Sequence, residues 1–449
     1  MALENNEVKV PKRILNTLIS SLAAGVVPRS GAPYIAIGRR DEIGSLLDNL
    51  DEVSEGGAFC RFLIGRYGSG KSFLIQLIRG YAIEKDFITL DADLSPERRL
   101  YGSNGSGLAT YRELIKNMAS KSSPDGGALS KIISKWMASL RAEILESGID
   151  EGSEEFINLL HRKISLAMKD IEFLVGGFDF SKTVAEYYRA YISGDDEKQS
   201  ACLRWLRGEF STKTEAKQAL GYNVSTIVND DNWYDYIKLW ASLVRKMGYN
   251  GLVVFVDECV NLYKIPNRVS RENNYEKILS MFNDTLQGQA EGLAIVFGGT
   301  PQFLDDTRRG LFSYEALKSR LCDSKYEIAG MKNLNNPIIR LVRLSDNELF
   351  ALLKRITDLF YQYYLCNLNV TDNNIIEFLR INLNKTGAET MITPREMLRD
   401  YITVLNILLQ NPQVDFDTVI KSQGDSDDEA RKGNGAPSKR TISAEDISF

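Results

Sequence analysis

The sequence predicts an α/β fold with a parallel sheet core, a large helical insertion and a C-terminal group of helices. In the N-terminal third, short apolar runs that suit buried strands alternate with amphipathic helical patterns, as in parallel sheets with helical crossovers. About 160 residues separate the second apolar run from the third, far more than a crossover connection needs. The chain has 449 residues, of which 43% are hydrophobic and 10% aromatic, enough for about three folding units with their own cores.

Five apolar runs are expected to form the sheet. The first leads into glycine-rich sequence and then a helix, and the second ends in two aspartates. The third and fourth are apolar throughout, as strands buried on both faces of a parallel sheet should be. The five runs are Ala58–Ile64, Phe87–Leu90, Leu252–Val256, Leu293–Phe297 and Ile338–Leu344.

Apolar residues at three- and four-residue spacing predict helices after the second strand and again after the fifth. The insertion is expected to contain helices at Leu108–Ala119, Ala128–Glu146, Glu154–Phe173, Lys182–Ile192, Lys198–Glu209 and Trp233–Met247. The C-terminal helices are expected at Asn347–Tyr364, Asp372–Leu383 and Pro394–Leu409.

These elements suggest four parts of the chain. Residues 1–29 form an N-terminal helical segment, and residues 30–344 form the core, with the helical insertion at about 108–250. Residues 345–412 form a helical lid. Residues 413–449 are mostly polar and are expected to be a disordered tail.

Composition and charge exclude several functional classes. Net charge is −5 and the pI is near 5.4, so no global positive field attracts nucleic acid, and any contact must be a local patch. Five cysteines lie far apart without a CxxC pair, and there is one histidine, which argues against structural zinc. No apolar run is long enough to span a membrane. We therefore expect a reduced, cytoplasmic protein.

A phosphate-binding motif follows the first strand. Residues 65–72 match GxxxxGK[ST] between a strand and a helix, the context in which this motif cradles phosphates. Lys71 would reach the β- and γ-phosphates, and the Ser72 hydroxyl would ligate Mg²⁺. A plain glycine turn is the alternative interpretation, which the flanking elements disfavour. The expected nucleotide contacts are Gly65, Arg66, Tyr67, Gly68, Ser69, Gly70, Lys71 and Ser72.

The third strand run ends in two carboxylates, Asp257 and Glu258. With a phosphate loop upstream, Asp257 would hold Mg²⁺ through its water shell, and Glu258 would polarise the attacking water. An apolar run ending in acids is weak evidence alone, because strands often end in acidic turns. The presence of Glu258 favours hydrolysis over a nucleotide switch without turnover.

Polar residues also follow two other strands. Thr300 comes after the fourth strand and could orient the water beside the γ-phosphate, with a weaker case for Gln302; a simple turn residue is the alternative. Asp91 and Asp93 could be metal ligands, but acids at this position more often cap a helix.

In order, the phosphate loop, the acidic strand end, the polar strand end and two later arginines resemble the AAA+ ATPases, especially their origin-recognition branch. The resemblance implies that Thr300 takes the sensor-1 role, that Arg320 is an arginine finger acting in trans and that Arg395 is the sensor-2 arginine of the lid. It also implies that Gly38 and Arg39, in the string IGRRDEI, pack on the adenine, which favours ATP over GTP.

More narrowly, six strings together resemble the BrxD-type ATP-binding proteins of bacterial BREX phage-defence systems, from about residue 13 to 412. This resemblance implies a cytoplasmic ATPase that acts beside other defence components, among them a helicase. The strings are GVVPRSGAPYIAIGR, LSPERRLYGSNGSGLATYRELIKNM, LRWLRGEFSTKTEAKQALG, GYNGLVVFVDE, GGTPQFLDDTRRGLFSYEALKSRL and TPREMLRDYITVLNILLQNP.

The sequence offers one main candidate for DNA contact. After the lid only about 37 mostly polar residues follow, too few for the winged-helix domain of origin-type initiators. The loop after the second strand joins Arg98, Arg99 and Tyr101 to a glycine run, which suits phosphate contact and base stacking. A solvated linker into the insertion is an equally good interpretation. Two further basic clusters are interpreted as solvated helix faces. One comprises Arg204, Arg207, Lys213 and Lys217, and the other comprises Lys9, Lys12 and Arg13.

Three functions therefore compete. The first is an ATPase that uses Mg²⁺ and assembles as a homo-oligomer or with defence partners. The second is a nucleotide switch or scaffold that binds ATP, recruits partners and turns over rarely. The third is a sequence-specific DNA binder that uses ATP to load something, which the acidic pI disfavours.

Overall fold

The computed structural model describes residues 9–102, 104–150, 153–322, 333–383 and 393–420. The chain divides into two compact units. One comprises Met1–Ile43, Gly65–Gly80 and Arg340–Phe449, and the other comprises Gly44–Ile64 and Tyr81–Ile339. Each unit is described by itself below. No helix of the described residues is long and apolar enough to cross a membrane.

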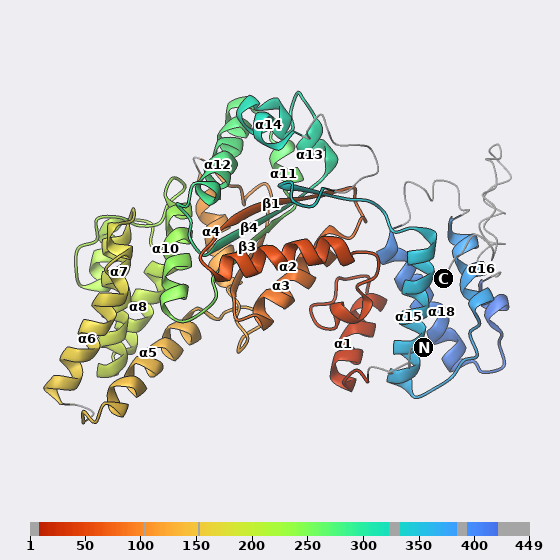
Figure 1. The fold of residues 1–449 in the computed structure, drawn as a ribbon, viewed down its shortest axis with the longest axis horizontal. Helices are drawn as coiled ribbons and strands as arrows, with labels where there is room; N and C mark the ends of the chain where they lie inside the picture. Colours follow the sequence, from red (N-terminus) through yellow and green to blue (C-terminus); the bar gives the residue numbers. More distant parts are fainter. Residues whose placement is uncertain (1–8, 103, 151–152, 323–332, 384–392, 421–449) are drawn as a thin grey trace. The chain divides into compact units, whose positions relative to one another are not determined.

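The predicted α/β fold is confirmed: five strands form one sheet in the order β2-β3-β4-β1-β5 (Figure 1). The pairs β2–β3, β3–β4 and β4–β1 are parallel. Every residue of β1, β3 and β4 is buried, which explains why their sequences are apolar runs rather than alternating patterns. The strands are β1 (Phe59–Gly65), β2 (Ile88–Asp93), β3 (Leu252–Asp257), β4 (Leu293–Gly299) and β5 (Ile338–Leu341).

The register aligns the carboxyl ends of four neighbouring strands. Asp93 pairs with Asp257 between β2 and β3, Val256 pairs with Phe297 between β3 and β4, and Ile64 pairs with Gly299 between β1 and β4. Residues that follow these ends therefore leave the sheet at one edge, where parallel α/β proteins bind ligands.

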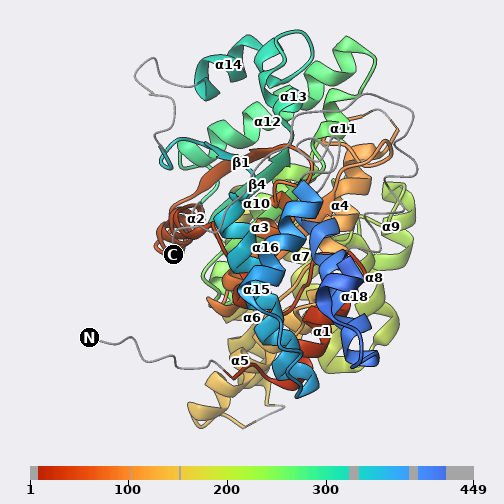
Figure 2. The same cartoon turned by 90° about the vertical axis from the view of Figure 1, so that its right-hand side faces the viewer.

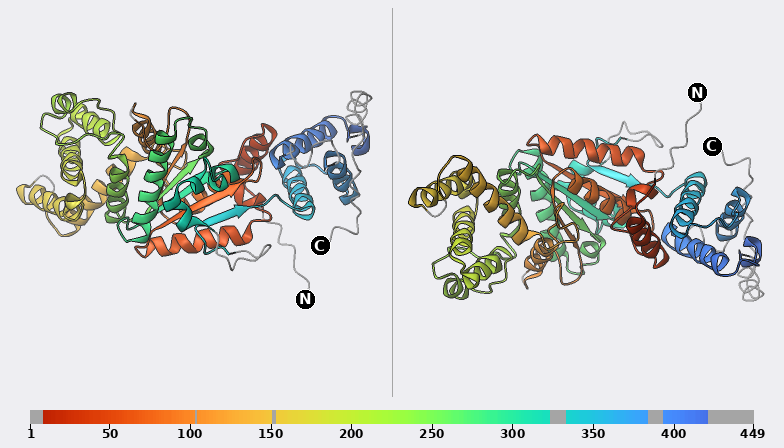
Figure 3. Two further views of the ribbon diagram at one scale, coloured as in Figure 1. Left: turned by 90° about the horizontal axis from the view of Figure 1, so that it is seen from above. Right: turned by 90° about the horizontal axis from the view of Figure 1, so that it is seen from below.

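The segment between β2 and β3 is helical, and its apolar residues belong to the same core as the sheet. Both views of Figure 3 show the yellow to green helices of this segment beyond the strands. Aromatic residues of α10 organise this core: Tyr236 packs against Trp205 at 5.6 Å between ring centroids, and Trp240 packs against Phe180 at 5.0 Å. The helices are α4 (Ser106–Lys116), α5 (Leu129–Glu146), α6 (Glu154–Met168), α7 (Gly177–Ser193), α8 (Asp196–Leu206), α9 (Lys213–Leu220) and α10 (Trp233–Lys246), with the short η2 (Ile171–Phe173).

Further helices connect the remaining strands, and most of them were not predicted. After β3 come α11 (Val260–Tyr263) and α12 (Arg268–Leu286), and after β4 come α13 (Pro301–Asp305), η3 (Leu311–Ser313) and α14 (Glu315–Leu321). Before β1 the chain forms η1 (Ala32–Ile35) and α2 (Arg40–Ser54), and after it α3 (Lys71–Glu84).

The smaller unit has its own apolar core, built by four helices that Figure 2 shows gathered together. Its helices at Asp346–Tyr364, Asp372–Leu383 and Pro394–Gln410 match the predicted C-terminal helices closely. Two of them begin with a capping box, in which Ser345 and Thr393 each exchange hydrogen bonds with the glutamate three residues later. The helices are α1 (Lys12–Ala23), α15 (Asp346–Tyr364), α16 (Asp372–Leu383) and α18 (Pro394–Gln410).

The start of the polar tail needs a correction. Phe416 and Ile420 are 6% and 4% exposed and belong to the core of the smaller unit, so the ordered chain continues past residue 413. The sequence concealed this because the apolar residues that follow Pro412 (Val414, Phe416, Val419 and Ile420) are few and are interspersed with polar ones. The expected disorder of residues 421–449 lies outside the described residues.

Candidate functional site

The backbone of the phosphate loop requires glycine at two positions. Gly68 and Gly70 have φ angles of +76° and +89°, a region that costs residues with a side chain roughly 1–2 kcal/mol. A Cβ on Gly68 would lie 2.5 Å from Cγ2 of Thr393, whereas a Cβ on Gly70 would have no neighbour within 4 Å. Gly68 is thus demanded by conformation and by close approach, and Gly70 by conformation alone.

Lys71 begins α3, and its ammonium group turns back to the loop. Nζ donates hydrogen bonds to the carbonyl oxygens of Gly65, at 2.9 Å, and Arg66, at 3.2 Å. Arg66 and Tyr67 are exposed, the latter at 76%, so their side chains do not hold the loop in place. The lysine charge is therefore kept beside the backbone that the motif uses to bind phosphates.

Arg39 is buried (5% exposed) and ties the phosphate loop to another segment. One terminal nitrogen, Nη2, donates to the carbonyl oxygen of Ser69 at 3.0 Å and also to that of Val342, just after β5. Nη1 lies 3.9 Å from Oε1 of Glu42. Burial lowers the pKa of Arg39, against the opposing influence of Glu42 and Glu348. A contact of Arg39 with adenine stays a prediction, and the observed role of the side chain is to hold backbone.

Thr393, the residue before α18, was not singled out by sequence reasoning. Thr393 caps α18 by accepting a hydrogen bond from the Glu396 N–H at 3.2 Å, and its side chain lies against Gly68. Arg395, two residues further on, is exposed, with its Cγ 3.9 Å from where a Cβ on Gly25 would lie. The first turn of α18 therefore meets the phosphate loop through Thr393.

Gly38 makes a second close approach to the lid. Its φ is +74°, and a Cβ there would overlap the carboxylate of Glu348 and lie 2.9 Å from Cδ2 of Leu344. Glu348 belongs to the capping box of α15. Gly38 is therefore explained by packing against this helix start, and its expected contact with adenine stays a prediction.

In the larger unit, the end of β3 presents the two expected carboxylates. Asp257 is 7% exposed, and its Oδ1 accepts a hydrogen bond from the Glu258 N–H at 2.8 Å. Glu258 is exposed and has a φ of +57°, an uncommon conformation for a residue with a side chain. Strained backbone of this kind is concentrated at functional sites. Here it turns the Glu258 side chain away from the buried strand.

Carboxylates gather at this edge of the sheet. Burial raises the pKa of Asp93, and the charges of Asp257, Glu258 and Asp91 raise it further, against the opposing effect of Arg98. The negative potential of these carboxylates favours binding of a cation. No group of three or more His, Cys, Asp or Glu residues placed to hold a metal occurs among the described residues. An ion here would therefore need ligands from hydroxyls, water or a bound phosphate as well.

Thr300 and Arg320 occupy different settings. Thr300 follows β4 and caps α13, accepting a hydrogen bond from the Phe303 N–H at 3.4 Å, so its own hydroxyl proton can still be donated. Arg320 is exposed on α14, where Nε donates to Oδ1 of Asn283 at 3.1 Å and Nη1 donates to the Ala316 carbonyl oxygen at 2.7 Å. Within the described residues Arg320 has no carboxylate partner.

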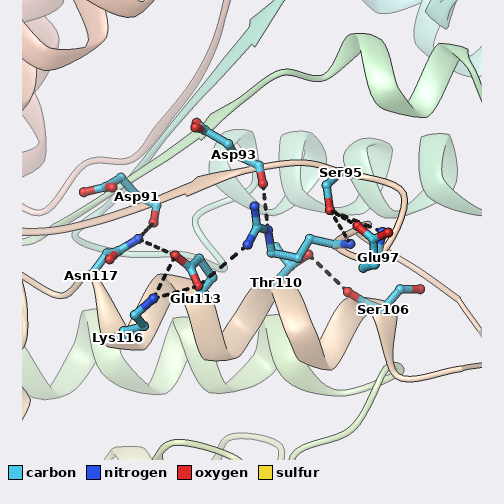
Figure 4. A network of polar contacts seen from close by, with 10 residues as sticks. Asp91, Asp93, Ser95, Glu97, Ser106, Thr110, Glu113, Lys116 and Asn117 are labelled. Carbon is cyan, nitrogen blue, oxygen red and sulfur yellow. Dashed lines mark hydrogen bonds and ion pairs between the residues drawn. The ribbon is translucent and has the colours of Figure 1, made fainter. Parts of the chain in front are cut away.

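The loop after β2 is anchored rather than flexible at the described residues. Arg98 donates to the Asp93 carbonyl oxygen at 3.0 Å and lies 3.9 Å from a carboxylate oxygen of Glu113, within the network drawn in Figure 4. Asn274 of α12 accepts hydrogen bonds from the N–H groups of Leu100 and Tyr101, both at 2.9 Å. Contact of this loop with DNA stays a prediction.

Acidic residues after the second strand were expected to cap a helix, but the carboxylate that accepts hydrogen bonds at the start of α4 is that of Asp230, from the N–H groups of Gly105 at 2.7 Å and Leu108 at 2.9 Å. In the basic cluster, Arg204 lies 3.2 Å from Glu215 and stays partly exposed, as a solvated helix face would. Long-range partners such as Asp230 and Asn274 carry no local sequence signal, which is why they were missed.

The sheet, the glycine loop between β1 and α3 and the acidic end of β3 define an α/β protein of the P-loop ATPase type. The family model of the BREX system ATP-binding protein BrxC/D matches residues 10–424, and the chain belongs to this family. It is thus an ATP-binding protein of a bacterial phage-defence system. A search of the curated proteins finds no significant match.

Proposed function

We propose that this protein binds ATP with Mg²⁺ and hydrolyses it as its contribution to BREX defence. The strand register carries the proposal: Ile64, the last residue but one of β1, pairs with Gly299 at the end of β4, and Asp257 ends the adjacent β3. The phosphate loop begins at the residue after Ile64, and Thr300 at the residue after Gly299. Chain connectivity alone therefore leads the loop, the polar residue and the acidic pair out of the same edge.

Each residue has a role that its chemistry supports. Lys71 and the loop N–H groups would neutralise the phosphates, and Ser72 with Asp257 would hold Mg²⁺, which prefers oxygen ligands and keeps several waters. Glu258 would accept a proton from the attacking water, and Thr300 would orient that water. Exposure of the Glu258 side chain and the spare proton of Thr300 support these assignments.

The residues fit the proposed ligand in three respects. Two loop glycines adopt left-handed backbone, which lets successive N–H groups face an anion. The Lys71 ammonium is held within the loop by carbonyl oxygens, from which a phosphate could draw it. Desolvation raises the pKa of Asp93 most, and the charges of Asp257, Glu258 and Asp91 raise it further; a divalent cation would relieve this repulsion between carboxylates.

We further propose that the active form is an assembly, either of copies of this chain or with other defence proteins, a helicase included. Arg320 would act in trans on the nucleotide of a neighbour, because it is exposed and lacks an acidic partner among the described residues. Arg395, also exposed, would act from the lid of residues 345–412, and the core would span 30–344. DNA contact through Arg98, Arg99 and Tyr101 is the weaker part, because this loop is anchored.

Two variants test the proposal by separating binding from turnover. Lys71→Ala should lose ATP binding, whereas Glu258→Gln should bind ATP normally and lose at least about a hundredfold in hydrolysis, the usual contribution of a general base. Glu291→Gln is the matched control, since this exposed acid precedes the amino end of β4. Glu258→Gln hydrolysis at the wild-type rate would disprove the base assignment, and wild-type binding without turnover would favour the switch function.

A further inference from the structure

Two arginines of the larger unit converge on one backbone oxygen. Arg271, in the first turn of α12, donates from Nη1 to the carbonyl oxygen of Ile265 at 2.9 Å. Arg309, between α13 and η3, donates from Nη2 to the same oxygen at 3.2 Å. Arg271 is 5% exposed, and the guanidinium of Arg309 lies 5.3 Å from the ring centroid of Tyr263. Two positive charges thus share a single neutral acceptor.

No negative charge balances this pair within the part of the chain that the structure describes. Neither guanidinium forms an ion pair there, and the Nε atom of each is buried without a hydrogen-bond partner. Asp306 is close in sequence, but its carboxylate accepts the N–H groups of Arg308 and Arg309 and the Tyr263 hydroxyl instead. Like charges removed from water are unfavourable together unless an anion compensates them.

The pair is built and placed to receive such an anion. The terminal nitrogens that remain, Nη2 of Arg271 and Nη1 of Arg309, form no hydrogen bond with the described residues and are not completely buried. Planar guanidinium groups match the geometry of phosphate oxygens better than lysine does. Ile265 follows the short helix after β3, and Arg309 follows the short helix after β4, beyond the strand ends where α/β proteins bind ligands.

We propose that Arg271 and Arg309 bind a phosphate group at a site made of none of the phosphate-loop residues. The same chemistry fits a free phosphate anion or the phosphodiester of a nucleic acid. The proposal does not depend on ATP hydrolysis, because neither arginine belongs to the machinery assigned above.

Thermal unfolding of the full chain carrying Lys71→Ala tests the site, since this background removes the phosphate loop as a competing binder. Inorganic phosphate should raise its melting temperature more than sodium chloride of equal ionic strength does. Adding Arg271→Gln or Arg309→Gln should increase, by about tenfold or more, the phosphate concentration needed for the same rise in melting temperature. This is the effect expected from losing hydrogen bonds to a charged group. Arg268→Gln is the matched control: it removes one charge from the same helix, where Arg268 pairs with Glu272 at 2.8 Å.

Fluorescence anisotropy of a labelled single-stranded oligonucleotide, measured on the same proteins, distinguishes the two sources. Oligonucleotide binding that Arg309→Gln weakens and free phosphate displaces supports a phosphodiester ligand. A phosphate response without oligonucleotide binding supports a small anion. Arg309 is less buried than Arg271, so its variant keeps the test valid if Arg271→Gln fails to fold. The proposal would be overturned if phosphate raised the melting temperature equally in the Arg309→Gln and Arg268→Gln proteins. It would also be overturned if phosphate did not raise the melting temperature of the Lys71→Ala protein.

Discussion

Replacing Gly68 by alanine tests whether the lid and the phosphate loop touch as described. The φ of +76° at Gly68 would cost alanine roughly 1–2 kcal/mol. A Cβ placed 2.5 Å from Cγ2 and 2.7 Å from Cβ of Thr393 would add about 1–3 kcal/mol of overpacking. Gly68→Ala should therefore lower the free energy of unfolding by roughly 2–5 kcal/mol.

Gly70→Ala is the control within the same loop. Its φ of +89° imposes a similar backbone strain, but a Cβ there meets nothing within 4 Å, so the expected loss is only about 1–2 kcal/mol. Both losses are measured by guanidinium unfolding without nucleotide, followed by circular dichroism.

Thr393→Ser then isolates the contact, because it removes the methyl group and keeps the capping hydroxyl. It should partly rescue Gly68→Ala, since Cβ of Thr393 remains, and should not rescue Gly70→Ala. A double-mutant cycle gives the coupling between the two positions. Equal destabilisation by the two glycine variants, with strictly additive effects of Thr393→Ser, would refute the contact.

Three further predictions follow from other parts of the molecule. Truncation after Gln413 removes Phe416 and Ile420 from the core and should destabilise the smaller unit by at least about 4 kcal/mol, whereas truncation after Ile420 should not; equal unfolding curves for both would contradict this. Arg320→Ala should bind ATP but lose turnover, and mixing it with Lys71→Ala protein should restore hydrolysis if the arginine acts in trans; normal turnover by Arg320→Ala under assembly conditions would rule this out. The raised pKa of Asp93 means that its contribution to stability is present below its ordinary pKa and is lost as the pH rises through the raised value. Asp93→Asn should accordingly raise the melting temperature near neutral pH and leave it unchanged in acid. A melting temperature below that of the wild type at neutral pH would show instead that the folded protein stabilises the charged carboxylate.

The strands were predictable because a strand that is buried on both faces has a continuous run of apolar residues in its sequence. Each predicted strand overlaps an observed one, and the differences are a few residues at the ends, where Gly65, Asp93 and Gly299 extend the strands beyond the apolar positions. The phosphate loop and the acidic end of β3 were visible for the same reason, since each directly follows such a run. Their chemical roles stay predictions.

Features that depend on long-range packing could not be predicted. Helix α12 was missed because its buried face includes Arg271, Asn274 and Asp284, which weakens the apolar periodicity that marks a helix. The contact of Thr393 with Gly68 joins residues more than 300 positions apart, and no local pattern encodes it. The ordered segment after Pro412 was missed because its few apolar residues are interspersed with polar ones.

The hydrogen bonds of Arg39 have a consequence for mutational tolerance. Both acceptors, at Ser69 and Val342, are main-chain carbonyl oxygens, which every amino acid supplies. Side-chain replacements at positions 69 and 342 therefore leave the acceptors in place, provided that the backbone keeps its path. These two hydrogen bonds between the phosphate loop and the segment after β5 therefore depend on one side chain, that of Arg39. A mutational scan should accordingly find position 39 intolerant even to lysine, whose single ammonium cannot reproduce the guanidinium fork, while position 342, where the residue is 66% exposed, accepts most residues.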